Sequence, residues 1–434
     1  MRAFAAGSIA GLAAALAVTA VSAEELRTYT STDPINDLQT ISVEGGLTRD
    51  LTIGLGSGAY RHPADPADMF YAVSDRGPNF TCAAAKKVIG IEGETICQGR
   101  KVRIYPTADY SPSIYNILLN SDGTFSIKDA IALKDKDGNP INGLTNPLTK
   151  ANTEVPIDLQ GNELAQSASA IDAEGIVKLT DGTFWIGEEN APSILHVTAD
   201  GRIQTRIVPE GTEGDFAGAK YDVIGGLPEI LYKRQTNRGI ESMAVSPDES
   251  KLYFILQNPL ANPDKAAYAQ AQNTRLFVVD RVSMKVEAQF VYQLTPFADW
   301  PNEELTKQNT QRISELTAIG NDRLLVLERT NKTTKLYEIS LDGATNISGT
   351  AWDDLETSPS LEQTNDVASI DIVPTAKTLR FDSADYTDVP VKLEGVAVMG
   401  DGSLALINDN DFGITGLETK VVIFNDPALT PAAN

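Results

Sequence analysis

Histidine and cysteine are nearly absent from this chain, which has two of each, His62 and His196, and Cys82 and Cys97. Two histidines are too few for a multi-histidine zinc or iron centre. A Ser-His-Asp enzyme would have to use one of them as its base, and Ser57, in a glycine-rich run, lacks the spacing of a nucleophile elbow. The cysteine spacing matches neither a CxxC motif nor a zinc site. Oxygen is therefore the main ligand type available to a metal.

Long apolar runs are also lacking after the first residues. Arg2, the apolar stretch from Ile9 to Val21 and the small residues ending at Ala23 predict a signal peptide over residues 1–23, cleaved after Ala23. An uncleaved anchor is the alternative, although the stretch is short for a membrane span. We expect residues 24–434 to form a single exported domain, periplasmic or secreted. In that compartment Cys82 and Cys97 are expected to form a disulfide that closes a surface loop.

Basic residues are also scarce in this chain compared with acidic residues. The chain has 36 basic and 59 acidic side chains, a net charge of −23. Such an excess of acid argues against nucleic acid or an anionic membrane surface as a partner. It suits cation binding, although acidic surfaces also serve solubility alone. The balance says nothing about oligomeric state.

A repeated pattern is what the chain has in abundance. A short strand opens with an acidic residue, passes through a tight turn and returns as a second strand that ends in polar residues. The turns include Asp181-Gly182 and Asp401-Gly402, which favour hairpins. The opening glutamates recur at intervals of roughly seventy residues, the size of a four-stranded module, and they are Glu174, Glu241, Glu315 and Glu394.

Four-stranded modules repeated end to end predict an all-β fold, a β-propeller. Five modules can be counted, and a sixth blade would fit in the long first interval; an open solenoid is the alternative. The modules begin near Ile41, Asp172, Gly239, Ile313 and Leu393. The last has three clear strands, and Leu26–Thr30 is expected to supply its fourth and close the ring. Helix is expected only near Pro263–Ala271 and Pro301–Gln308.

The inner strands of a propeller line its axis, so the repeated glutamates should gather around one mouth. Carboxylates crowded together must be protonated, paired with cations or bound to metal. We expect a metal site there, with ligands from the opening glutamates and from acids that end second strands: Asp75, Glu174, Glu188, Glu241, Glu394, Asp409 and Asp411. Arginines lie in the same motifs, namely Arg76, Arg238 and Arg329. The alternative is that each glutamate ties its blade to a neighbour through backbone N–H groups.

At these motifs the chain resembles the phytase-like family, described as having esterase-like activity of phytase. The resemblance runs from about Gly45 to Phe424. The matching stretches are Ser74-Asp75-Arg76-Gly77-Pro78-Asn79, Asp172 to Gly175, Asn237 to Glu241, Leu327-Glu328-Arg329, Glu394-Gly395-Val396 and Asn408 to Gly413. The resemblance implies a β-propeller and, by analogy with propeller phytases, calcium-assisted hydrolysis of a small anionic phosphate ester. Fold alone does not fix function.

The leading hypothesis is therefore a phosphoesterase that uses Ca²⁺ to neutralise the phosphate and activate water. The arginines Arg76, Arg238 and Arg329 would clamp the phosphoryl oxygens, and Glu174 would act as the base. Two alternatives stay open. One is a non-catalytic propeller that binds calcium or a ligand, and the other is a metal-free carboxyl-ester hydrolase or lactonase.

Overall fold

The structure is a computed structural model that describes residues 26–31, 33, 37–46, 48–300 and 303–429. The predicted signal peptide, residues 1–23, lies outside the described residues. Within those residues, no helix is both long and apolar enough to cross a membrane.

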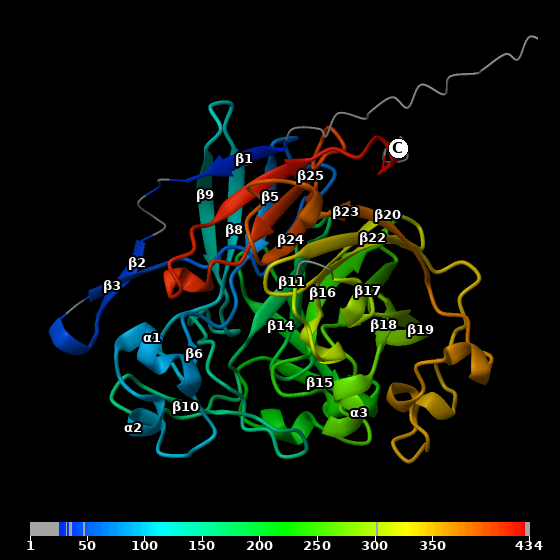
Figure 1. Cartoon of the computed structure of the whole chain (residues 1–434), viewed down its shortest axis with the longest axis horizontal. Helices are drawn as coiled ribbons and strands as arrows, with labels where there is room; N and C mark the ends of the chain where they lie inside the picture. The colour runs from blue at the N-terminus through cyan, green and yellow to red at the C-terminus, as the bar shows by residue number, and fades with distance from the viewer. Residues whose placement is uncertain (1–25, 32, 34–36, 47, 301–302, 430–434) are drawn as a thin grey trace, which may run out of the picture.

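Five blades make up most of the described chain (Figure 1), and the first four strands of each blade pair antiparallel. In blades 1 to 4 the strands follow chain order from the axis outward, whereas the outermost strand of blade 5 is the first described strand of the chain. Blade 1 contains β4 (Gly58–Tyr60), β5 (Met69–Val73), β8 (Ser113–Leu119) and β9 (Phe125–Ala132). Blade 2 contains β11 (Ala173–Lys178), β12 (Phe184–Glu188), β13 (Ser193–Val197), β14 (Ile203–Pro209) and a parallel fifth strand, β15 (Asp222–Leu227). Blade 3 contains β16 (Ile240–Val245), β17 (Lys251–Leu256), β18 (Asn273–Asp280) and β19 (Lys285–Gln293).

The last two blades follow the same plan. Blade 4 contains β20 (Arg312–Gly320), β21 (Arg323–Arg329), β22 (Thr334–Ser340) and β23 (Ala376–Asp382). Blade 5 contains β24 (Leu393–Val398), β25 (Leu404–Asn408), β26 (Lys420–Phe424) and β1 (Arg27–Thr30). The inner strands contact one another in cyclic order, β4, β11, β16, β20, β24 and back to β4. The predicted propeller is confirmed, and the described residues form five blades.

Strand β1 closes the last blade. It pairs antiparallel with β26, with Arg27 opposite Ile423 and Thr30 opposite Lys420. Figure 1 shows this blue strand beside the red C-terminal strands. The closure predicted for Leu26–Thr30 is confirmed, apart from Leu26, which precedes the strand. Pairing this edge removes an exposed row of backbone N–H and C=O groups.

The first module differs from the prediction. Residues near Ile41 form no blade, because β2 (Asp37–Ser42) and β3 (Thr48–Thr52) make a separate two-stranded hairpin. The inner strand of blade 1 is β4, within the glycine-rich run. At Gly58 a Cβ would lie 2.6 Å from the carbonyl oxygen of Glu174 in the neighbouring blade. Glycine there permits the close approach of two inner strands.

The long first interval holds a small lobe instead of a sixth blade. Its sheet contains β6 (Phe80–Thr81), β7 (Val102–Ile104) and β10 (Val155–Ile157), and its helices are α1 (Ala85–Ile89) and α2 (Gly93–Cys97). We call these elements the disulfide lobe; they lie to one side of the blades (Figure 1). The lobe shares an apolar core with the β2–β3 hairpin, formed by side chains such as Ile41, Val88 and Ile104.

The predicted helix near Pro263–Ala271 is confirmed as α3 (Lys265–Gln270), whose N-cap Asp264 accepts hydrogen bonds from Ala266 and Ala267. In the predicted segment Pro301–Gln308, the described residues 303–307 form no helix, and a 3₁₀ turn follows at Gln308–Thr310. Helices α1 and α2 were not expected from the sequence.

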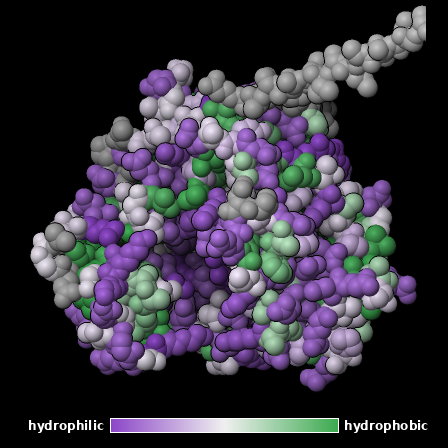
Figure 2. Space-filling model, viewed as in Figure 1, coloured by the Kyte–Doolittle hydropathy of each residue, from purple (hydrophilic) through white to green (hydrophobic). Residues whose placement is uncertain are grey.

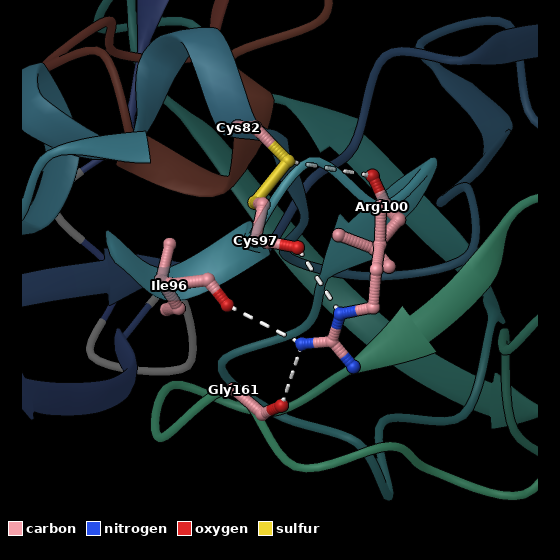
Figure 3. The surroundings of a disulfide bond; sticks show 6 residues. Cys82, Ile96, Cys97, Arg100 and Gly161 are labelled. Atoms are coloured by element: carbon pink, nitrogen blue, oxygen red, sulfur yellow. Dashed lines mark hydrogen bonds between the residues drawn. A yellow bond between two sulfur atoms is a disulfide. The ribbon is translucent and has the colours of Figure 1, made fainter. Parts of the chain in front are cut away.

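The disulfide predicted between Cys82 and Cys97 is confirmed (Figure 3). It links the start of the helical segment to the end of α2. Arg100 fixes the same turn, because its guanidinium donates hydrogen bonds to the carbonyl oxygens of Ile96, Cys97 and Gly161. The disulfide therefore braces a folded lobe whose apolar core is shared with the β2–β3 hairpin, and not only a surface loop.

Candidate functional site

A polar cavity of about 310 Å³ opens at one end of the inner strands. The face drawn in Figure 2 is hollowed near its centre, and the colouring there is hydrophilic, in keeping with the polar lining of the cavity. Its lining contains seven acids and six bases: Asp75, Glu174, Glu189, Glu241, Glu394, Asp409, Asp411, Arg76, Arg103, Arg238, Arg312, Arg329 and Lys392. We call it the central cavity.

Backbone geometry explains why acids from distant parts of the chain meet here. Glu174, Glu241 and Glu394 are each the second residue of an inner strand. In each of these strands the pairing with the second strand is irregular at the glutamate. A bulge at this place changes the direction of a side chain, here toward the axis. Because second strands run antiparallel, the residues that follow them, such as Asp75 and Asp409, reach the same end.

The carboxylates converge closely enough to hold a cation. Asp75, Asp172 and Glu174 each offer an oxygen, and these oxygens lie within 4.8 Å of one another. The same holds for Glu174, Glu241 and Glu394, so Glu174 belongs to both sets.

Burial makes these charges costly. It raises the pKa of Glu174 and of Glu241 well above the usual range, and the neighbouring carboxylates raise both further. Burial also raises the pKa of Glu394 to about 7, although nearby Arg329 opposes the rise. Without a cation, this set of acids holds protons at a pH where exposed carboxylates are ionised.

The residues fit a hard cation in a second respect. Buried oxygens that line the cavity have no hydrogen-bond partner among the described residues, including Oε2 of Glu241 and Oε1 of Gln257. Unpaired buried oxygens are costly unless a ligand satisfies them. Carboxylate and amide oxygens together are the ligands that Ca²⁺ takes in proteins. The donor set therefore suits calcium better than zinc.

Two of the three predicted arginines are already paired. A guanidinium nitrogen of Arg76 lies 2.9 Å from Oδ2 of Asp172. Arg329 forms an ion pair with Glu394 and lies 3.7 Å from Glu241. These two arginines hold carboxylates in place and are not free to clamp an anion.

Arg238 is less engaged. Its nearest carboxylate partner is Glu189, at 3.6 Å, and its side chain is about one quarter exposed. Of the three predicted arginines that line the cavity, it is the least closely paired with carboxylates.

The predicted acids divide into those that line the cavity and one that does not. Glu188 lies outside the lining. Its carboxylate is fully buried, 3.1 Å from Arg206, and accepts hydrogen bonds from the backbone N–H groups of Asp172 and Ala191. It anchors the turn that carries Glu189. The other predicted metal ligands, together with Arg76, Arg238 and Arg329, all line the cavity.

The fourth repeated glutamate has a different role. Glu315 accepts hydrogen bonds from the backbone N–H groups of Ala59, at 2.8 Å, and of Leu316, at 2.9 Å. It therefore ties blade 4 to blade 1 across the axis. This is the structural role that the sequence left open for every repeated glutamate.

Sequence reasoning missed several residues of the site. Asp172 and Glu189 lie in motifs that the sequence singled out, Glu189 among the acids that end second strands, although neither was predicted as a ligand. Lys392 lies 2.7 Å from Asp409 and 2.5 Å from Asp411, and it neutralises much of their charge. Arg103 comes from the disulfide lobe, where no repeat pattern pointed to it. Both histidines lie outside the lining; His196, for example, stacks on Trp185.

Comparison with known proteins places the chain in a family. A relative from Arthroderma benhamiae, named an uncharacterized secreted protein, is 23% identical over 313 residues, covering 66% of this chain and 59% of the relative. A solved structure of a protein of unknown function from Bacteroides caccae is 8% identical, with a TM-score of 0.28, over 69% of this chain and 62% of that one. The WD40 repeats of RRP9 are 10% identical, with a TM-score of 0.34, over 92% of this chain and 99% of theirs.

The two structural likenesses are too weak to bear on the site. The chain spans about three fifths of the length of the first two proteins. The family model described as phytase-like, esterase-like activity of phytase, matches residues 52–412, which include every acid and base of the central cavity. The chain belongs to the phytase-like family.

Proposed function

We propose that the protein is an exported, calcium-dependent phosphoesterase that acts on a small anionic phosphate ester in the central cavity. One observation carries the proposal. Three glutamates from three blades, Glu174, Glu241 and Glu394, bring oxygens within 4.8 Å of one another, with buried oxygens beside them that lack partners. Family membership supports hydrolysis of an ester, and the disulfide and the secreted relative support export.

Calcium bound to these oxygens would neutralise phosphate charge and lower the pKa of a nearby water. Asp75, Asp409 and Asp411 add to the acidic lining, and Lys392 lowers the pKa of Asp409 despite its burial. Arg76 and Arg329 fix the orientation of the carboxylates that they contact, and Arg238 binds the phosphoryl oxygens.

We assign Glu174 as the proton acceptor. Water adds to phosphorus, and the bond from phosphorus to the ester oxygen breaks. The proton taken by Glu174 is returned to that oxygen, so the products are an alcohol and inorganic phosphate. Glu174 belongs to both carboxylate sets, so a water beside the bound ion would lie within reach of its carboxylate.

A non-catalytic calcium-binding propeller is the second candidate. It is favoured by the internal pairing of Arg76, Arg329 and Lys392 with carboxylates, because much of the charge in the cavity is matched without a substrate. A metal-free ester hydrolase is less well supported, since Thr81 is the one hydroxyl-bearing residue in the described lining, which has no serine, cysteine or histidine.

Calorimetric titration with calcium, together with phosphate release from sugar phosphates and p-nitrophenyl phosphate, tests the proposal. We expect calcium binding and phosphate release that stops with chelator and returns with calcium. Binding without turnover of any phosphate ester would favour the second candidate. Absence of calcium binding would overturn the metal mechanism, and ester or lactone hydrolysis that survives chelation would favour the metal-free enzyme.

A further inference from the structure

Arg312 is a cation of the central cavity that has no carboxylate partner within ion-pair distance among the described residues. It begins β20, and its register partner on β21 is Arg329. Like charges directly opposite each other on neighbouring strands destabilise a sheet. Arg329 is compensated by Glu394 and Glu241, whereas Arg312 is not. The fold thus keeps an unmatched guanidinium at the wall of a cavity.

Arg238 adds a second, weakly matched guanidinium beside it. The two arginines interact electrostatically, and burial together with Arg329 and Arg238 lowers the pKa of Arg312 to about 10. Arg312 therefore stays positively charged at neutral pH. Both guanidinium groups line the central cavity, and an anion bound there would relieve the repulsion between them.

Helix α3 contributes a further polar group to the same place. Burial raises the pKa of the Tyr268 hydroxyl in this helix, and Arg238 and Arg312 each act to lower it, so Tyr268 lies near both arginines. α3 also packs against the 3₁₀ turn Gln308–Thr310, which leads directly into Arg312. The two guanidinium groups are thereby held by separate elements that contact each other.

The carboxylates of the calcium site are close to this pair. Glu241 and Glu394 both act electrostatically on Arg312, although neither forms an ion pair with it. An anion bound between Arg238 and Arg312 would therefore lie next to a cation held by those carboxylates. A single ligand in that position would need oxygens for both guanidinium groups and for the calcium ion.

We propose that Arg238 and Arg312 form a subsite for a tetrahedral oxyanion, a phosphoryl or sulfuryl group, at the side of the central cavity. A planar carboxylate has two oxygens, which one guanidinium fork can occupy completely. A phosphoryl group of a monoester has three non-bridging oxygens, enough for both arginines and the ion. This inference rests on the proposed function, because the subsite would hold the phosphoryl group of the proposed substrate. Anion binding at the subsite itself needs no calcium.

The experiment measures anion binding to the intact protein in the presence of chelator. Inorganic phosphate, sulfate and acetate are titrated by calorimetry, and melting temperatures are recorded with each anion. The variants are Arg312→Met and Arg238→Met. The control is Arg323→Met, which removes an exposed arginine paired with Glu338 on the same blade.

We expect phosphate and sulfate to bind the parent and the control and to raise their melting temperatures. Acetate should do neither at the same concentration. Arg312→Met and Arg238→Met should each weaken phosphate binding at least tenfold. Without anions, Arg312→Met should melt at the same temperature as the parent or higher, because a like-charge pair has been removed.

Three results would overturn the subsite: equal phosphate binding by Arg312→Met and the parent, acetate binding as tight as phosphate, or an anion-free Arg312→Met protein that melts lower than the parent. If Arg312→Met does not fold, Arg312→Lys decides, since it keeps the charge but loses the fork and should still weaken phosphate binding. Phosphate bound under chelation without any phosphoesterase activity would support the subsite while the proposed function fails.

Discussion

The two ends of the inner strands use acidic residues in opposite ways. At the far end from the cavity, aspartates occupy the turns to the second strands. Asp181 accepts hydrogen bonds from the backbone and hydroxyl of Thr183, at 2.9 and 2.7 Å, and Asp401 does the same with Ser403, at 3.0 and 2.6 Å. These bonds lower the pKa of both aspartates.

At the cavity end the acids are buried, crowded and short of donors, so burial raises the pKa of Glu174, Glu241 and Glu394. Both kinds of acid recur from blade to blade. Repetition alone therefore does not separate a structural acid from a functional one. The supply of hydrogen-bond donors does, and Glu315 shows this within the glutamate set, because backbone N–H groups satisfy it.

The largest expected difference between acids at the two ends of the inner strands is in their effect on catalysis. Glu174→Gln keeps the shape of the side chain but removes a charge shared by both carboxylate sets. It should weaken calcium binding at least tenfold and lower phosphoesterase kcat/KM by about a hundredfold or more. Asp181→Asn, in the same blade at the other end, should change neither. Calcium titrations and initial rates on both variants measure this, and equal effects of the two would abolish the distinction between the ends.

The second contrast lies within the repeated glutamates. Glu315→Ala leaves buried backbone N–H groups without an acceptor, which costs about 1–3 kcal/mol for each group. Urea unfolding should show that loss, while calcium affinity stays as in the parent. Glu241→Gln should show the reverse pattern. A Glu315→Ala protein that unfolds like the parent but loses calcium would move Glu315 into the site.

The third test uses pH on the calcium-free protein. Burial, against the opposing effect of nearby arginines, raises the pKa of Glu394 and Asp172 to about 7. Unfolded carboxylates titrate near 4, so between about pH 4 and 7 the folded chain binds more protons than the unfolded one. The free energy of unfolding therefore falls as pH rises through this window.

With chelator present, we expect the melting temperature to be several degrees lower at pH 8 than at pH 5. Calcium should reduce that difference, because the ion replaces the protons. Scanning calorimetry across the range measures it. A calcium-free melting temperature that stays level or rises toward pH 8 would show that the buried acids are matched in some other way.

The smallest effect belongs to the turns. Asp248 accepts hydrogen bonds from Ser246 and Ser250, which lower its pKa to about 2. Because the folded value is depressed, its contribution is present above about pH 4 and is lost as pH falls toward 2. Asp248 is exposed, so Asp248→Asn should cost less than about 1 kcal/mol near neutral pH and nothing near pH 2. A loss that persists at pH 2 would point to packing instead of charge.

The features that could be predicted from the sequence are those that repeat from blade to blade. Hairpin turns, opening glutamates and polar strand ends recur with the blade, so the propeller, its closure by β1 and most acids of the cavity followed from the pattern. Blade 1 was misread because close approach of the inner strands demands glycine at Gly58, and glycine reads as a turn.

Arg103, Arg312 and Lys392 were not identified from the sequence as residues of the cavity. Arg103 lies in the disulfide lobe, outside the repeats. Arg312 begins β20 and Lys392 directly precedes β24, so the repeat marked their place but pointed to the glutamates and not to these bases. The ion pairs of the cavity could not be predicted from the sequence either. Nothing in the local sequence shows that Arg76 is held by Asp172, or that Arg329 is held by Glu394 while its register partner Arg312 is not.

The strand that closes the ring also sets the order in which the molecule can be completed. β1 precedes every other described strand in the chain, and its partner β26 follows all of them. Until β26 is in place, β1 cannot join blade 5 and both β1 and β25 have an unpaired edge, the kind of surface on which chains pair wrongly. Loop closure over nearly the whole chain adds an entropic barrier that rises only slowly with length. The closing seam therefore forms only when the two ends of the described chain come together, and a chain that lacks β26 leaves β1 without its pairing partner.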